Sequence, residues 1–497
     1  MAEHTVASQV LLYAFTNRLE DTALVQESLQ NLLPILCSKM GCSDRGPREN
    51  FLAFLGELLT RIPSEVNKYV SINSFHLLTS SLVFPPDPAW VESVYTTIRS
   101  IITPGPSPGE RRSSFIVIAG LLNAYPPELL FRPQPLRKGS PASNLKPFVY
   151  LLIQLATIDV RSAFPAILEQ LASPSYPATA QRLAAAFDIV VSFLAFLVRA
   201  EDFASIGMEP DLLLQLRSDI GEMFGLTLEF LRDRWGVAYT GTLGFEPGHE
   251  EGVPKSITWD STSGDGPEKD VLITSAMRAL ALWLKEDEGL RTEGGGLMDV
   301  FLGLWSKGLA CAVDHRSWVL GVLEGVLQES HGRAMFREFR GWKLLWGDLK
   351  AIANSEQPSK HELWLGCEEA RTLASFVRDD RFSNGEWTRD LAVTVAGVSV
   401  GSGGRAKLEL HIAILSLASA CLRVRQEESA KASLQREYEQ LCRSHQMMAA
   451  AVKELEGGGG GVSRRAERCI ARRVLRSSDV GNCTQYHPRR CGSARSV

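Results

Sequence analysis

Apolar residues recur every three or four positions along most of this chain, and that spacing constrains the fold more than any other feature. It places the apolar side chains on one face of a 3.6-residue helix. In 182–200 the large apolar residues follow one another at intervals of four, three, four and three: Leu183, Phe187, Val190, Leu194 and Leu197. The same spacing predicts helices over 148–158, 211–234 and 271–284, the second preceded by Pro210 at a position that a first helical turn tolerates. The sequence therefore predicts an all-α fold.

Proline-containing breaks separate the periodic segments. They lie at 41–47, 85–88, 104–108, 125–127 and 174–177. Because proline fixes φ and has no backbone N–H, each break marks a helix end. Helices of one to two dozen residues joined by short turns are typical of an armadillo/HEAT-like α-solenoid. No strict sequence period supports this prediction, which depends on helix length and rhythm alone.

Composition divides the chain into three parts. Residues 1–395 carry the helical pattern and form the predicted solenoid, with a mobile loop at about 236–268 where Gly, Ser, Thr, Pro and acidic residues gather. Within it, 391–400 alternates like a strand, but a single strand has no partner here, so we favour a helix or loop. Residues 396–456 form a C-terminal helical segment. Residues 457–497 begin with five glycines and then carry nine arginines against two acids, which predicts a hinge and a disordered basic tail.

Charge and cysteine usage favour a cytoplasmic protein. The net charge of −4 gives no general reason to expect nucleic acid or an anionic membrane as partner. The nine cysteines are scattered and never form CxxC, so a reducing compartment fits better than a disulfide framework. The start of the chain lacks the basic and long apolar regions of a secretory signal. The longest apolar run, 187–198, is shorter than the roughly twenty residues of a membrane span, so we expect a buried helix and no transmembrane segment.

The motifs that would mark an enzyme are incomplete. His361-Glu362 begins like a zinc-protease motif, which needs a second histidine four residues after the first, and that position is Leu365. The GxxxxGK[ST] phosphate-loop pattern is missing from the sequence. The glycine-rich run 401–405 is interpreted as a linker. We therefore predict no catalytic, cofactor-binding or metal-binding residues, and no enzymatic activity.

Two charged clusters are candidates for contact with a partner. The first lies at the predicted end of the 211–234 helix, where arginines would cap the helix because cations complement its dipole, while Trp235 would pack on the neighbouring repeat. The second follows Trp283 and is interpreted mainly as a solvated helix end and turn. The alternative for both is a partner contact on the solenoid surface. The partner-binding candidates are Arg232, Arg234, Lys285, Glu286, Asp287 and Arg291.

Two segments resemble the neurochondrin-like proteins of fungi, a helical-repeat family related to animal neurochondrin. The first is FLRDRW at 230–235, followed after the loop by TWDS at 258–261. The second lies within 273–301, and LWLKEDEGLRTEGGGLMD is its most specific part. The resemblance covers about 180–305 and extends from the N-terminus to about 390, without the tail. The sequence departs from the family at Gly294 and Gly295, where alanines are expected, since glycine in a helix costs about 1 kcal/mol each.

The resemblance implies a cytosolic armadillo-type scaffold that binds other proteins, in signalling or trafficking, and it brings no catalytic residues. The arginine-rich tail leaves an alternative open: a nuclear or ribonucleoprotein-associated factor whose tail binds RNA or an import receptor. A peripheral membrane role is a further alternative, because animal members are lipid-modified on cysteine. Cys37 and Cys42 lie near a predicted turn and would be the residues concerned.

Overall fold

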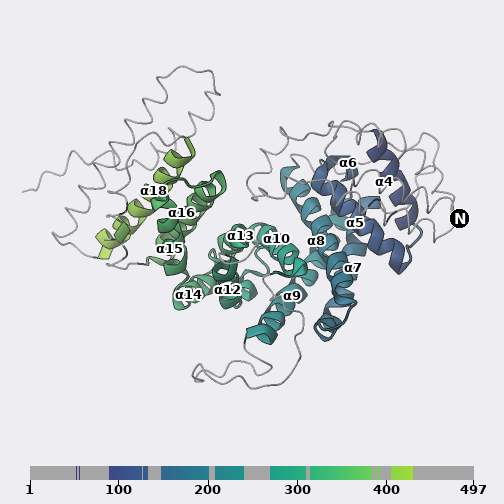
Figure 1. The fold of residues 1–497 in the computed structure, drawn as a ribbon, viewed down its shortest axis with the longest axis horizontal. Coiled ribbons are helices and arrows are strands. Elements are labelled where there is room, and N and C mark those ends of the chain that lie inside the picture. The colour runs from purple at the N-terminus through teal and green to yellow at the C-terminus, as the bar shows by residue number, and fades with distance from the viewer. Residues whose placement is uncertain are drawn as a thin grey trace, which may run out of the picture. The chain divides into compact units, whose positions relative to one another are not determined.

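The structure, a computed structural model, divides the chain into two compact units, Met1–Phe339 and Arg340–Val497, and each is described by itself. It describes residues 89–131 except Pro126, then 147–200, 208–239, 269–308, 314–382 and 405–428, and the isolated residues Leu52, Leu55, Trp387, Asp390, Leu391 and Thr394. Every regular element in these ranges is a helix (Figure 1). Cys37 and Cys42, most of the predicted loop, and the tail lie outside the described residues.

The helices predicted over 148–158, 182–200, 211–234 and 271–284 are all present in the first unit, and the proline breaks at 104–108, 125–127 and 174–177 lie at helix ends. Residues 103–107 separate the first two described helices, and Pro108 begins the second of them. The helix predicted over 211–234 begins at Pro210 and continues to Tyr239. The elements are α4 (Ala89–Ile102), α5 (Pro108–Ala124), α6 (Glu128–Phe131), α7 (Phe148–Ile167), η4 (Leu168–Gln170), α8 (Tyr176–Arg199), α9 (Pro210–Tyr239), α10 (Val271–Glu286), α11 (Arg291–Gly295), α12 (Met298–Gly308), α13 (Arg316–Val326) and α14 (Ser330–Glu338).

Helix α8 forms the core of the first unit. It packs against α5, α7 and α10, while α9 packs against α7. Phe187 and Phe193 are fully buried on it, and Phe193 meets Phe131 of α6 edge to face at 5.6 Å between ring centroids. Each helix therefore packs on helices close to it in the chain, as in an α-solenoid, and the all-α solenoid prediction is confirmed.

Two described helical segments, 148–170 and 176–199, are long and apolar enough to cross a membrane by length and composition alone. In the second, 72% of the most apolar window is buried against other helices. Its Asp188 forms an ion pair with Arg278 of α10. The prediction of a buried helix for the 187–198 run is therefore confirmed.

Glycines allow the helices from α9 to α14 to approach closely. A Cβ at Gly303 of α12 would lie 2.2 Å from the indole of Trp235, so the predicted packing of that tryptophan on the next repeat is confirmed. Gly294 and Gly295 occupy α11, where an added Cβ would lie 3.1 Å from Val326 Cγ2 and 3.1 Å from His331 Cδ2 respectively. A side chain at either position would therefore meet a tight contact, and the avoidance of that contact offsets the helical cost of glycine there.

The second unit is built on three described helices: α15 (Gly341–Asn354), α16 (Lys360–Asp380) and α18 (Arg405–Glu428). Helix α16 packs against both others. It begins with a capping box in which Glu362 accepts a hydrogen bond from the Ser359 N–H at 2.6 Å, so the carboxylate of the sequence's His-Glu pair serves as a helix cap. Leu391 and Thr394 are helical, which agrees with a helix in the strand-like run. The boundary predicted at 395 stays a prediction.

A buried histidine makes the second unit sensitive to acid. His411 of α18 is 4% exposed, and burial followed by repulsion from Lys407 lowers its pKa to about 4. A histidine whose folded pKa is depressed contributes stability that is present above the unfolded pKa of about 6.5 and is lost as pH falls toward 4. We expect about 2 kcal/mol of stability to be lost between about pH 7 and pH 5 on this account. Urea denaturation across this pH range will show that His411→Leu loses less free energy of unfolding than the unmodified chain. Equal losses in the two proteins would mean that His411 is not the source of the acid sensitivity.

Two buried thiols in the second unit are expected to be unreactive. Burial raises the pKa of Cys367 and of Cys421 to about 12. At about pH 8 the thiolate fraction is then on the order of one in ten thousand. Iodoacetamide labelling followed by peptide mass mapping should leave both cysteines unmodified in the folded chain and modify both in guanidinium chloride. Rapid labelling of either cysteine in the folded chain would disprove this prediction.

Candidate functional site

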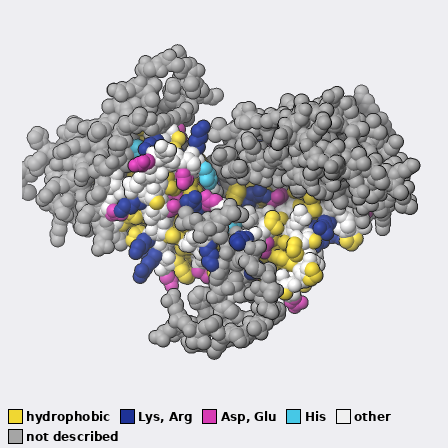
Figure 2. Space-filling view, in the orientation of Figure 1, with side chains coloured by type: hydrophobic (Ala, Val, Ile, Leu, Met, Phe, Trp, Pro, Cys, Tyr) yellow, Lys and Arg dark blue, Asp and Glu magenta, His cyan; other side chains and the backbone are white. Residues whose placement is uncertain are grey.

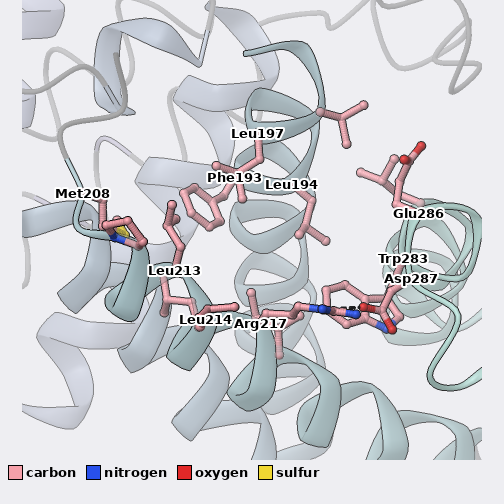
Figure 3. Close-up of a pocket in the computed structure, with 15 residues that line it drawn as sticks. Phe193, Leu194, Leu197, Met208, Leu213, Leu214, Arg217, Trp283, Glu286 and Asp287 are labelled. Carbon is pink, nitrogen blue, oxygen red and sulfur yellow. Dashed lines mark hydrogen bonds and ion pairs between the residues drawn. The ribbon is translucent and has the colours of Figure 1, made fainter. Parts of the chain in front are cut away.

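An apolar groove with a volume of about 760 Å³ lies in the first unit. Its walls are the C-terminal ends of α8 and α10 and the N-terminal half of α9 (Figure 3). Phe193, Leu194 and Leu213 face the common space between α8 and α9. Three of its fifteen lining residues are charged, namely Arg217, Glu286 and Asp287.

Helix α9 supplies the longest wall because its apolar residues are spread over a broad arc. Six residues of α9 line the groove: Pro210, Leu213, Leu214, Leu216, Arg217 and Ile220. They span about three turns, or roughly 15 Å at 1.5 Å per residue. Leu216 and Ile220 are buried, whereas the Leu214 side chain, on the groove, is 63% exposed. Val198, at the end of α8, is 53% exposed on the opposite wall.

The floor of the groove is held by aromatic packing. Trp283 of α10 lies against Phe224 of α9 with 5.2 Å between ring centroids. Phe224 in turn packs against Phe187 of α8, with 6.4 Å between their ring centroids. These rings join the three helices that form the walls, so the groove is set by the core and not by surface side chains.

An ion pair closes one end of the groove. Arg217 Nε donates to Asp287 Oδ2 at 2.7 Å, and Arg217 extends across from α9 toward Trp283 (Figure 3). Asp287 Oδ1 also accepts a hydrogen bond from the Gly289 N–H at 2.9 Å. The exposed carboxylate of Glu286 lies apart from that pair at the same end (Figure 3).

The second predicted cluster forms the end of α10 and its turn. Helix α10 ends at Glu286 with Asp287 as C-cap, as a helix end and turn require. The structure brings Glu286 and Asp287 to the groove. Lys285 points elsewhere, and its Nζ forms an ion pair with Oε2 of Glu324 on α13 at 2.9 Å. The guanidinium of Arg291 donates to the carbonyl oxygens of Leu284 and Lys285, both at 2.9 Å, and so caps α10.

The first predicted cluster lies apart from the groove lining. The capping role predicted for its arginines is wrong, because α9 continues past them to Tyr239. The side chain of Arg234 is only 9% exposed and its Nε lies 4.0 Å from Asp270 Oδ2. Asp270 also caps α10, accepting from the Leu272 N–H at 2.9 Å. Arg234 therefore links the end of α9 to the start of α10, and it offers little surface to a partner.

Arg232 is exposed and lies beside the turn after α11, where a Cβ at Gly296 would be 3.5 Å from its Nη2. A partner contact there stays a prediction, as it does for Lys285. In the space-filling view, hydrophobic side chains also gather over α7 (Figure 2), on which Ile158 is 51% exposed. Exposed apolar surface in the first unit is therefore not confined to the groove.

Sequence reasoning missed the groove leucines because a helical pattern does not say which apolar residues stay uncovered. The run LLLQL at 212–216 is wider than one buried face needs, and that width was the available signal. Within the described ranges, no group of three or more His, Cys, Asp or Glu side chains could hold a metal ion.

Comparison with known proteins finds a family whose model matches more than half of this chain. Residues 31–360 match the model of the neurochondrin family. An uncharacterized protein of Schizosaccharomyces pombe (strain 972) is 23% identical over 217 residues, which cover 43% of this chain and 35% of that protein. The chain thus spans about a third of the length of this relative. The structure of the TSC2 N-terminus is 12% identical, with 90% of this chain and 99% of that chain covered and a TM-score of 0.25, too low to carry an argument.

Proposed function

The chain belongs to the neurochondrin family, and on that premise we propose that it is a non-enzymatic scaffold that binds other proteins, in signalling or trafficking. The proposal is carried by one observation, the apolar groove between α8, α9 and α10. A cytoplasmic location without a transmembrane segment is part of the proposal, and microscopy of a fluorescent fusion of the full chain would test it.

The groove supports binding because uncovered apolar surface is costly in water. Burying apolar surface stabilises a complex by about 25 cal/mol per Å². Leu214 and Val198 both line the groove, and each residue is more than half exposed. Interfaces gain most of their energy from apolar anchors that enter a preformed pocket surrounded by polar residues. The groove has this form, with an apolar interior and Arg217, Glu286 and Asp287 at one end.

Leu214→Glu is expected to weaken partner binding on the order of thirtyfold, because it would bury a charge in the interface or keep the partner out. Because Leu214 is 63% exposed, the free energy of unfolding should change by no more than about 0.5 kcal/mol. The measurement is affinity purification of the tagged full chain with quantitative mass spectrometry, followed by titration of the recovered partner against both proteins.

Ile158→Glu is the matched control, since Ile158 is 51% exposed on α7 and does not line the groove. Partners lost from Leu214→Glu but kept by Ile158→Glu would support a scaffold that binds through the groove. If both variants retain every partner of the unmodified chain, the groove is not the binding surface and the proposal fails.

A further inference from the structure

We propose that the groove binds an amphipathic α-helix of a partner protein that carries Lys or Arg beside its apolar stripe. This inference rests on the proposed function and deepens it by naming the chemistry of the partner. It follows from the polarity, the length and the charge of the groove, taken in turn.

The polarity of the lining favours a helix over an extended peptide. An extended peptide carries an unpaired N–H and C=O at every residue and needs main-chain partners, usually a strand edge. None of the described residues forms a strand, and twelve of the fifteen lining side chains have no charge. A helix satisfies its own backbone hydrogen bonds and presents only side chains, so it can enter an apolar groove without leaving polar groups unpaired.

The length of the groove matches a short helix. The α9 wall from Pro210 to Ile220 spans about three turns. A partner helix of three to four turns would place apolar residues at i, i+3 or i+4, and i+7 along it. The volume of about 760 Å³ accommodates several such side chains. Leu214 and Val198, the exposed apolar residues of the lining, would be available to contact this stripe.

The charge around the groove favours a cation on the partner. Arg217 and Asp287 neutralise each other as an ion pair, which leaves the exposed Glu286 as the uncompensated charge of the lining. Two further exposed acids, Glu209 and Asp211, flank Pro210 at the start of α9.

Two described cations that are next to lining residues in the sequence have partners within the protein. Lys285 pairs with Glu324, and Arg199 donates to the Ala195 carbonyl oxygen at 2.9 Å. A lysine or arginine next to the apolar stripe would therefore be attracted to the Glu286 end.

The test is selection from a display library of peptides of about four helical turns, with leucines fixed at i, i+3, i+4 and i+7 and all flanking positions randomised. The tagged full chain is the bait. We expect selected peptides to carry Lys or Arg over Asp or Glu about threefold more often at one flanking position. The charge reversal Glu286→Lys should abolish or invert that preference, and Leu214→Glu should lose the peptides while Ile158→Glu keeps them.

The outcomes separate this inference from the proposed function. If Leu214→Glu loses partners in the affinity purification but no helical peptide is selected, the scaffold function stands and the helix inference fails. Selection of helices whose flanking charges ignore Glu286→Lys overturns the charge argument. A fluorescent fatty-acid probe that binds the chain but not Leu214→Glu, without any selected peptide, would make the groove a lipid site and overturn the inference. Failure of both experiments removes the scaffold function as well.

Discussion

Asp159→Ala is expected to lower the free energy of unfolding of the first unit by about 3–5 kcal/mol, because it breaks a buried ionic cluster on one side only. The Asp159 side chain, on α7, is 2% exposed. Its Oδ1 accepts hydrogen bonds from Arg111 Nη1 of α5 at 3.0 Å and from Arg182 Nη1 of α8 at 3.1 Å. One carboxylate therefore joins three helices, and its removal leaves two partly buried guanidinium groups without their anion.

The cost arises from unpaired charge more than from lost attraction. Burial raises the pKa of the Asp159 carboxyl, and the two arginines oppose that effect. Because desolvation offsets much of a buried pair's attraction, replacing all three members with apolar residues of similar size should cost far less than Asp159→Ala alone. A triple variant Arg111→Met, Asp159→Leu, Arg182→Met should thus be much more stable than Asp159→Ala. If the three substitutions acted independently, the triple variant would instead be at least as destabilised as Asp159→Ala.

Urea denaturation of the full chain, with hydrogen exchange read on peptides from α5, α7 and α8, measures this effect in the unit concerned. Asp233→Ala is the control, since Asp233 is an exposed carboxylate on a helix of the same unit and should change stability by no more than about 0.5 kcal/mol. A loss below about 1 kcal/mol for Asp159→Ala would show that the cluster is not formed as described.

The helices were predictable from the sequence because the burial of one helical face repeats every 3.6 residues. Leu183, Phe187 and Val190 are indeed buried on α8. The end of α9 was not predictable, because Arg232 and Arg234 look like a dipole-complementing cap, yet the helix continues for five residues after Arg234. The partner of Arg234 is Asp270, and that pairing depends on how α9 and α10 meet in space.

The candidate site was predictable only in part, and for a physical reason. Local charge singled out Glu286 and Asp287, which do lie at the groove. The apolar walls could not be found, because Leu214 and the buried Leu216 are the same residue type two positions apart. Which of them is covered depends on the placement of α8 and α10. Helical periodicity does not say which helices pack against one another, and that packing decides which leucine is covered.

Gly325→Ala is expected to destabilise the first unit by about 2–4 kcal/mol, even though alanine is the better helix former by about 1 kcal/mol. Gly325 lies on α13, which packs against α10. A Cβ there would lie 2.3 Å from the carbonyl oxygen of Leu284 and 2.5 Å from its carbonyl carbon. Both atoms belong to backbone, so no side-chain rotation relieves the clash, and α10 or α13 must move.

That movement would also disturb the cap of α10, because the same Leu284 carbonyl oxygen accepts the hydrogen bond from Arg291 Nε. Arg291→Ala should therefore cost less in the Gly325→Ala background than in the unmodified chain, since the bond it removes is already weakened. Thermal and urea denaturation of the four proteins measures this coupling directly. Equal costs in both backgrounds would mean that the cap and the helix contact act independently.

Gly225→Ala is the matched control, because Gly225 is also a helical glycine of the first unit but has nothing within 4 Å of an added Cβ. Alanine there should stabilise the chain by up to about 1 kcal/mol, through helix propensity and a less flexible unfolded state. The same substitution is thus expected to have opposite signs at two positions that the sequence alone does not distinguish. If Gly325→Ala were also stabilising, α10 and α13 could not approach as closely as the Leu284–Gly325 contact requires.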